Sequence, residues 1–323
     1  MGWAGAASAA CQLQQTAEFK VVMDGNRPLI DGAVNGHPIR FMLDTGSFST
    51  VISPAAAAGL GLTVYELRGV TSYGVGGGDK TGETTIQTLQ VGNAVAHNIV
   101  LMVTGQGLRS SQFVGLLGEE FLSRGDLELD FANGVMRMIQ PKGCAGDDVA
   151  YWAKAYSVTP LAPSTVNEVL QVYVMLNGHR TLAVIDTGAA TSIVATGAAA
   201  SAGVTPQSEG SREIGRTGGI AGKSLSAFIG VFPTFSIGEE TIKNAKLEIA
   251  DMFTADAEVR LGSRLPQKMV EAPQMLLGAD FIRSHHMYVA RSQGKVYFSY
   301  NGGPIFQVTG PRADEAPAAP VAP

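Results

Sequence analysis

The chain has 323 residues, of which 45% are hydrophobic and 16% charged, and its formal net charge is −5. This composition can bury a large core, and it shows no basic face or run of the kind that nucleic-acid-binding proteins use. No apolar stretch reaches the roughly 18 residues needed to cross a bilayer, so we expect no membrane span. The 40 glycines favour an all-β fold with many tight turns.

The N-terminal segment, 1–17, is rich in small residues and resembles the end of a secretory signal peptide. Export would place the protein in the periplasm or outside the cell, where oxidising conditions favour a disulfide between Cys11 and Cys144. Two alternatives stay open for the cysteines. Cys11 is also placed as a lipid-anchor residue would be, and the two can be unrelated thiols.

An internal repeat organises the chain. The tripeptide Asn-Gly-His occurs at 35–37 and at 177–179, and in each case six residues separate it from Asp-Thr-Gly, at 44–46 and 186–188. Asn-Gly is a strong signal for a two-residue hairpin turn, because both residues accept a positive φ. Three apolar residues stand directly before each Asp-Thr-Gly, as expected of a buried strand. Each half therefore predicts a hairpin whose second strand runs into the tripeptide.

Further landmarks follow the first tripeptide. Ser53-Pro54 predicts a helix N-cap with proline at the first helical position. Tyr73 to Gly78 forms a glycine-rich hairpin, and 114–122 reads as an apolar strand, a glycine and a short helical turn. A final hairpin turns at Asn133-Gly134. In the strand before that turn, the acids Asp126, Glu128 and Asp130 are expected to face solvent rather than to bind calcium.

The second half repeats these landmarks with a glycine-rich segment at 215–222, an apolar strand and turn at 274–282, and a final turn at 293–294. His285-His286, directly after the second landmark, is expected at the end of its helix. Gly118 lies 74 positions after Asp44, whereas its counterpart Gly278 lies 92 positions after Asp186. The second half therefore carries an insertion of 18 residues, which we place within 252–273.

These boundaries divide the chain into five parts. They are the N-terminal segment 1–17, a first repeat at 18–142, a linker at 143–165, a second repeat at 166–308 and a Pro/Ala-rich tail at 309–323. The tail cannot bury apolar area, so we expect it to be disordered.

The paired tripeptides predict one catalytic site. Two carboxylates about 3 Å apart share one proton, because like charges that close cannot both ionise, and such a pair can act as base and acid in peptide hydrolysis. One strand end supplies a single carboxylate, and two repeats related by a pseudo-two-fold axis supply two. We therefore predict Asp44 and Asp186 as the catalytic pair, at an interface that one chain can form as a monomer.

The neighbouring residues fit this site. The glycines Gly46 and Gly188 allow close backbone approach, and the hydroxyls of Thr45 and Thr187 can bond across the axis. The glycine-rich hairpins are predicted to be flaps that close over substrate. The flap residues are Tyr73, Gly74, Val75, Gly76 and Gly77 in the first half, and Gly218, Gly219 and Ile220 in the second.

The order of strand, Asp-Thr-Gly, glycine-rich hairpin, apolar-apolar-Gly and short helix resembles one subunit of the retropepsin-like aspartic proteases, and it is present twice. The resemblance implies two β-barrel-like lobes about a pseudo-two-fold axis, and endopeptidase activity on an extended polypeptide without a cofactor. It also implies that Tyr73 to Gly78 is the better flap candidate. One departure concerns the residue after the landmark glycine. Retroviral enzymes usually place arginine there, and this chain has Glu119 and Ala279.

A second function is compatible with the same fold. An exported pseudoprotease would bind peptides without turnover, although such a module has no need of both carboxylates. The five histidines show no metal-ligand spacing, so neither function is expected to use a metal.

Overall fold

The computed structural model describes residues 10–108, 110, 112–164, 169–219, 224–252 and 272–306. The predicted tail and Ile220 of the second flap lie outside these ranges, as does all but the ends of the predicted insertion. None of the described helices is long and apolar enough to cross a membrane. The described elements are strands with a few short helices, as the all-β prediction requires.

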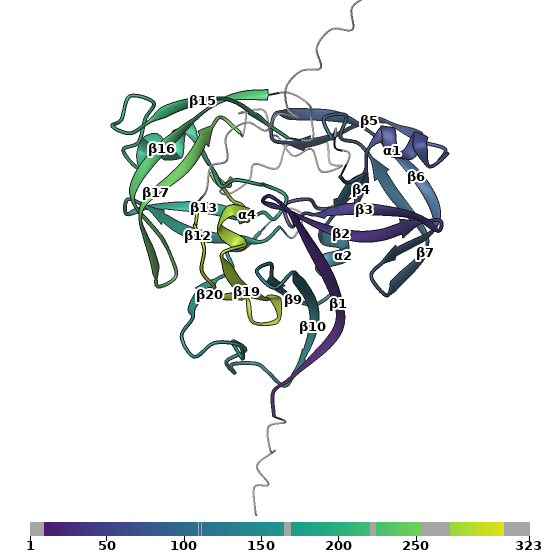
Figure 1. The fold of residues 1–323 in the computed structure, drawn as a ribbon, viewed down its shortest axis with the longest axis horizontal. Coiled ribbons are helices and arrows are strands. Elements are labelled where there is room, and N and C mark those ends of the chain that lie inside the picture. Colours follow the sequence, from purple (N-terminus) through teal and green to yellow (C-terminus); the bar gives the residue numbers. More distant parts are fainter. Residues whose placement is uncertain are drawn as a thin grey trace, which may run out of the picture.

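Each half of the chain forms one seven-stranded lobe, and the two lobes lie side by side in Figure 1. The first has the order β2-β3-β8-β4-β7-β6-β5 and the second the order β12-β13-β18-β14-β17-β16-β15. Additional pairings, β2 with β6 and β12 with β16, curl each sheet onto itself. Because corresponding strands take corresponding places, the predicted pair of barrel-like, pseudo-symmetric lobes is confirmed.

The strands of the first lobe are β2 (Arg27–Val34), β3 (His37–Leu43), β4 (Val51–Ile52), β5 (Tyr65–Gly74), β6 (Gly77–Val91), β7 (Ala94–Val103) and β8 (Gly115–Leu117). Those of the second are β12 (Gln171–Leu176), β13 (His179–Ile185), β14 (Ile193–Ala195), β15 (Arg212–Gly218), β16 (Ser224–Ile237), β17 (Glu240–Ala250) and β18 (Met275–Leu277).

The two Asn-Gly turns form as the sequence predicts. Asn35 and Gly36 have φ of 49° and 80°, and Asn177 and Gly178 have 51° and 81°. The Asn35 side-chain oxygen also accepts the backbone N–H of Thr88, so the turn is tied to a neighbouring strand of its lobe. Asn177 is tied to β16 in the same way. These hairpins set the register of the strands that lead into the Asp-Thr-Gly loops.

Short helices follow the strands at fixed places in each lobe. They are α1 (Pro54–Gly59) and α2 (Glu119–Leu122) in the first, and α3 (Thr196–Ser201) and α4 (Ala279–Ile282) in the second. Ser53 is the N-cap of α1, where its hydroxyl accepts the N–H of Ala56 at 3.1 Å. The predicted cap is thus confirmed.

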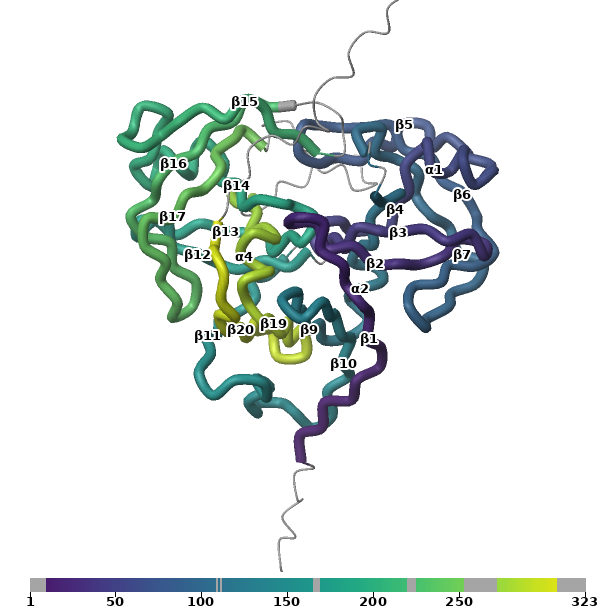
Figure 2. Tube along the Cα trace, in the orientation of Figure 1, coloured from purple at the N-terminus to yellow at the C-terminus, as the bar shows by residue number. Residues whose placement is uncertain are grey.

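Six strands join the lobes, in the order β11-β20-β19-β9-β10-β1. This joining sheet continues through the β1–β2 pairing into the first lobe, and together they form one 13-stranded sheet. The strands of the joining sheet are β1 (Gln12–Asp24), β9 (Asp126–Asp130), β10 (Val135–Lys142), β11 (Ser157–Pro160), β19 (His285–Ala290) and β20 (Lys295–Tyr300), with a 3₁₀ turn, η1 (Arg291–Gln293), between the last two. Strands β9 and β19 pair antiparallel, so the two halves meet at the centre of this sheet. Figure 2 shows β1 running beside β10 away from the lobes.

The joining sheet takes in segments that the sequence placed elsewhere. Strand β1 begins at Gln12, six residues before the predicted start of the first repeat, and β11 lies within the predicted linker. The prediction that Asp126, Glu128 and Asp130 face solvent was wrong, because all three are buried. Strand β19 and the linker cover them, and Glu128 accepts hydrogen bonds from Tyr151 and from a ring nitrogen of His286.

The two adjacent histidines of the second half also differ from expectation. They do not end a helix but begin β19, and both side chains are buried. The His286 ring stacks on Trp152 of the linker, with 4.3 Å between ring centroids. The linker is therefore part of the packed interface between the halves.

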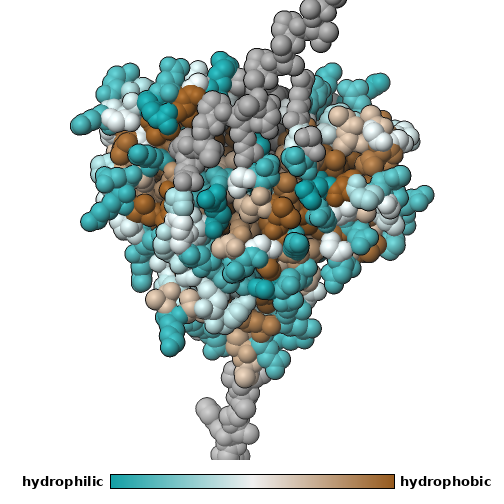
Figure 3. Space-filling model, viewed as in Figure 1, coloured by the Kyte–Doolittle hydropathy of each residue, from teal (hydrophilic) through white to brown (hydrophobic). Residues whose placement is uncertain are grey.

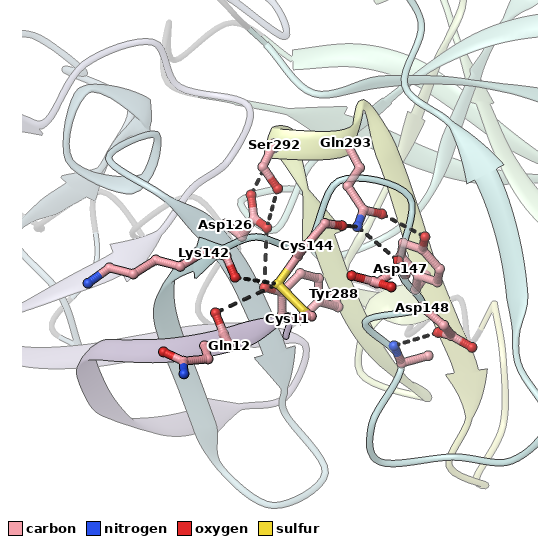
Figure 4. Close-up of a disulfide and its surroundings, with 12 residues drawn as sticks. Cys11, Gln12, Asp126, Lys142, Cys144, Asp147, Asp148, Tyr288, Ser292 and Gln293 are labelled. Carbon is pink, nitrogen blue, oxygen red and sulfur yellow. Dashed lines mark hydrogen bonds between the residues drawn. A yellow bond between two sulfur atoms is a disulfide. The ribbon is translucent and has the colours of Figure 1, made fainter. Parts of the chain in front are cut away.

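A disulfide between Cys11 and Cys144 closes the first repeat, which is the first of the alternatives considered for these cysteines. Figure 4 shows Gln293 beside it, donating to the backbone oxygens of Cys144 and Asp147. The bond therefore ties β1 to the linker, and Gln293 ties the linker to the second half.

Figure 3 shows hydrophilic residues over the outer margins of both lobes, with hydrophobic residues gathered nearer the middle of that face.

Candidate active site

The two aspartates occupy equivalent positions at the ends of β3 and β13. Each strand runs parallel to a neighbour, β8 or β18, which also pairs antiparallel with the strand after the loop. The N–H of Asp44 donates to the Leu117 oxygen at 3.0 Å, and the N–H of Asp186 donates to the Leu277 oxygen at 2.9 Å. The central strand thus fixes each aspartate at the point where the chain leaves the sheet.

Backbone N–H groups orient each carboxylate. Asp44 Oδ1 accepts from Gly46 and Ser47, both at 2.9 Å. Asp186 Oδ1 accepts from Gly188 at 2.8 Å and Ala189 at 3.1 Å. Because one oxygen of each group is engaged within its own loop, the second oxygen is left for the partner aspartate or a substrate.

The carboxyl groups face each other across the lobe interface. A Cβ placed on Gly46 would lie 2.6 Å from the Asp186 carboxyl carbon, and one on Gly188 would collide with the Asp44 carboxyl carbon. Each carboxyl group therefore packs against the glycine of the opposite loop. Only glycine leaves this space, which is the physical reason for its place in both tripeptides.

The threonines lock the loops together. Thr45 Oγ1 accepts the N–H of Thr187 at 3.0 Å and donates to the Ile185 oxygen at 2.6 Å. Thr187 Oγ1 accepts the N–H of Thr45 at 3.0 Å and donates to the Leu43 oxygen at 2.8 Å. Both side chains are fully buried, so these four bonds form in a low-dielectric setting, where their loss is costly.

Burial and the charge of the neighbouring carboxyl group raise the pKa of this pair. Burial raises the pKa of Asp44 well above its usual range, and the negative charge of Asp186 raises it further. Burial also raises the pKa of Asp186, against the lowering effect of the two backbone N–H groups. One protonated and one ionised carboxyl is the state in which such a pair can give and take a proton.

The first glycine-rich hairpin reaches the second lobe. Strands β5 and β6 turn at Val75-Gly76, and Val75 packs against an apolar cluster of the second lobe that includes Ala189, next to Asp186. Gly219 lies against Val75 so closely that a Cβ there would be 2.8 Å from the Val75 oxygen. The structure thus brings the described parts of both predicted flaps together beside the aspartate loops.

Tyr73 takes a different position from the flap tip. Its side chain is 63% exposed, and its ring lies across Gly78 on the neighbouring strand. The other flap residues of the first half, Gly74, Gly76 and Gly77, form the turn, where Gly76 and Gly77 have φ of 93° and 116°.

Apolar residues behind the loops were not predicted as part of a site. In the first lobe the cluster comprises Leu29, Met42, Val51, Phe113 and Leu116, with Met102 and Leu108 against it. In the second it comprises Val184, Ile193, Ala227, Ala250, Met252 and Leu276, with Val75, Val169, Ala189 and Ile214 against it. These clusters adjoin the aspartate loops, so they are candidate walls for a substrate side chain. No short motif marks them, and only strand register brings them together.

Glu119 follows the landmark glycine of the first half, where retroviral enzymes usually place an arginine. Glu119 of α2 forms an ion pair with Arg291, which lies in the last turn of the second half. Both side chains are largely buried. Glu119 belongs to the first half and Arg291 to the second, so the pair links the two halves.

Two equivalent lobes with facing Asp-Thr-Gly loops define the aspartic-protease class of fold. The sequence profile of the aspartyl protease family matches residues 30–121 and 172–281, one segment in each lobe and together more than half of the chain. The chain therefore belongs to the aspartyl protease family and carries its domain twice, as the repeat predicted.

Among solved structures, the chain is similar to a retropepsin-like aspartic protease from Rickettsia conorii. The match has 20% sequence identity and a TM-score of 0.30, and it covers 41% of this chain and 95% of that chain. No curated protein matches the chain significantly in sequence.

Proposed function

We propose that this protein is an aspartic endopeptidase that hydrolyses peptide bonds of an extended polypeptide, with Asp44 and Asp186 as its catalytic pair. The reciprocal packing of each carboxyl group against the glycine of the opposite loop carries the proposal. The raised pKa of both carboxyl groups supports the proposal, and family membership implies a polypeptide substrate.

In this mechanism the ionised carboxylate takes a proton from a water molecule, which attacks the carbonyl carbon of the scissile bond. The protonated carboxyl donates to the carbonyl oxygen, and a later proton transfer frees the amine. The threonine bonds hold the two carboxyl groups in register, since a 1 Å error can cost about 100-fold in rate. The first flap supplies a cover that excludes water from the reacting groups.

The decisive test is a peptide-library cleavage profile of the wild type beside Asp44→Asn and Asp186→Asn. If the carboxyl groups act as a unit, either substitution lowers the rate by at least about 1,000-fold, roughly 4 kcal/mol of barrier. Cleavage retained by either variant would reject the mechanism. Tight peptide binding by a wild type that forms no product would instead favour the peptide-binding pseudoprotease.

We further propose that the protein works in an oxidising compartment, the periplasm or the extracellular space. The Cys11–Cys144 disulfide supports this, because such bonds persist where thiols are not kept reduced. To test this, the native host is fractionated and the protein is alkylated with and without prior reduction. Mass spectrometry then counts the alkylated thiols in each fraction. Recovery from the cytosol with two alkylated thiols would contradict the proposed location.

A further inference from the structure

The wall behind the second aspartate loop contains a buried acid. Glu248 lies on β17 and pairs with Ile193 of the apolar cluster that comprises Val184, Ile193, Ala227, Ala250, Met252 and Leu276. Ala250, two residues further along the strand, belongs to the cluster, and alternate residues of a strand share one face. Glu248 is therefore placed on the sheet face that carries this cluster, and it is only 4% exposed.

The carboxyl group of Glu248 is only half satisfied. Its Oε2 accepts a hydrogen bond from the hydroxyl of Thr191 at 2.8 Å. Its Oε1 is buried and has no hydrogen-bond partner among the described residues, none of which forms an ion pair with Glu248. Burying a carboxylate without a counter-charge is costly, so a group that supplies a charge and a donor would bind favourably here.

A second acid increases the negative potential at this place. Asp280 of α4 is buried, and its carboxyl accepts the N–H and hydroxyl of Ser192, next to Thr191. Burial raises the pKa of Asp280 to about 6, and the charge of Glu248 contributes to that increase. Two acids therefore lie close together behind one loop, and a cation that approaches the cluster meets an unopposed negative charge.

The first lobe has no such acid at the equivalent position. Val51 pairs with Met102 in the same parallel arrangement that joins Ile193 to Glu248. Met102 packs on the apolar cluster of its own lobe. The hydroxyl of Ser49, which corresponds to Thr191, is buried without a partner among the described residues. The hydroxyl–carboxylate pair is therefore a feature of the second wall alone, and core packing does not require it.

This acid is also close to the reacting groups. Thr191 is three residues after Gly188, and Ala189, which donates to Asp186, packs on the same cluster as Ile193. Val75 at the tip of the first flap also packs against this cluster. A substrate side chain that displaces Val75 would therefore meet an apolar wall with a carboxylate in its floor.

From these contacts we propose that Glu248 is a specificity-determining residue that selects a lysine or arginine at one position of the substrate. This inference rests on the proposed endopeptidase function and names its substrate class. The aliphatic part of the basic side chain packs on the apolar cluster, and its charged end pairs with Oε1 of Glu248. The first lobe, with Met102, selects an apolar side chain on the other side of the scissile bond.

The experiment compares peptides that differ at one position between lysine and norleucine, scanned on both sides of the cleaved bond. Wild type should favour lysine by about tenfold or more in kcat/KM at a single position, since a charge-assisted bond discriminates by that order. Acetylation of that lysine should remove the preference. This arm needs no variant, so it decides the matter even if a substitution at 248 prevents folding.

Three variants complete the test. Glu248→Gln keeps the shape and the bond from Thr191, and Glu248→Met copies the first lobe. Both should lose the preference for lysine, and Glu248→Met should favour norleucine. Glu239→Gln is the matched control, because it removes the same charge from the exposed turn that leads into β17. It should leave the preference unchanged.

The outcomes separate the two proposals. A wild type that cleaves but shows no lysine preference at any position, or a preference that survives Glu248→Met, overturns the role of Glu248 and leaves the endopeptidase intact. A wild type that cleaves no peptide overturns the endopeptidase. In that event calorimetry on wild type and Glu248→Met tests the subsite through the ratio of their affinities for the lysine and norleucine peptides. Wild type should bind the lysine peptide more tightly, and Glu248→Met should lose that preference.

Discussion

The loops at 44–47 and 186–189 hold their aspartates with matching hydrogen bonds, whereas the walls behind them differ in chemistry. Each aspartate accepts two backbone N–H groups, and each lies against the opposite glycine. Behind the first loop the wall is apolar around Met102, and behind the second it contains Glu248. If the two carboxyl groups share one proton, as we propose, symmetry is required only at the reacting groups. A polypeptide substrate is itself asymmetric, so the walls are free to diverge.

The joining sheet is likewise symmetric in its strands but asymmetric in the cross-links that hold it. It is built from equivalent strands of both halves, yet the disulfide closes only the first repeat. The acid and the base of the Glu119–Arg291 pair likewise come from non-equivalent positions. The symmetry that the sequence repeat implies is therefore strict at the centre and relaxes with distance from the two aspartates.

The strongest way to break the central symmetry is to add one methyl group. Gly46→Ala would place its Cβ 2.6 Å from the Asp186 carboxyl carbon, and Gly188→Ala would do the same to Asp44. We expect either variant to lose at least about 100-fold in kcat/KM, because the opposite carboxyl must move. Peptide cleavage assays measure the loss.

Gly59→Ala is the control for these variants. Gly59 ends α1, and a Cβ there would meet nothing within 4 Å. We expect full activity and a stability change of roughly 0 to 1 kcal/mol in favour of the variant. Equal loss of activity in all three variants would show that the close contacts at Gly46 and Gly188 are not responsible.

Substitution of either threonine should have a smaller effect, of equal size in the two loops. Thr45→Val and Thr187→Val each leave a buried N–H of the other loop without its acceptor, so each should lower the free energy of unfolding by about 1–3 kcal/mol. Denaturant unfolding measures both. Serine at either position keeps the hydroxyl and should restore most of the loss. A large difference between the two valine variants would contradict the equivalence of the loops.

The raised pKa of Asp44 should also affect how the stability of the protein depends on pH. Because the folded-state pKa of Asp44 is raised, its contribution to stability is complete below the ordinary value of 3.8 and is lost as pH rises through the raised pKa. Asp44→Asn stays neutral at every pH, so its melting temperature should exceed that of wild type at pH 7. The difference should shrink as the pH falls towards 3.8 and be absent below it. A wild type more stable than Asp44→Asn at pH 7 would contradict the raised pKa.

The sequence predicted the parts of the fold that short motifs specify. The Asn-Gly turns, the Ser53 cap and the two strand–loop units are local features, because turn and cap residues act on their own backbone. Repetition of those units was enough to infer two lobes, and family membership confirms them. The roles of Asp44 and Asp186 remain predictions, for which the structure supplies the geometry.

What the sequence did not predict depends on contacts between distant strands. The alternation of Asp126, Glu128 and Asp130 is typical of a strand with one solvated face, and only β19 and the linker, from far along the chain, bury that face. Glu248 likewise sits in an unremarkable strand, and its place beside Thr191 follows from a register that no motif encodes. The environment of such residues can be inferred only when the strands that pack against them are known.

The central claim is that two unlike lobes of one chain form one active site. Its most direct test is a calorimetric titration of the chain with a peptide in which a hydroxyethylene group replaces the scissile amide. We expect one inhibitor bound per monomeric chain, and at least about 100-fold weaker binding to Asp44→Asn and to Asp186→Asn alike. Half an inhibitor per chain, or binding that survives one of the two substitutions, would contradict it.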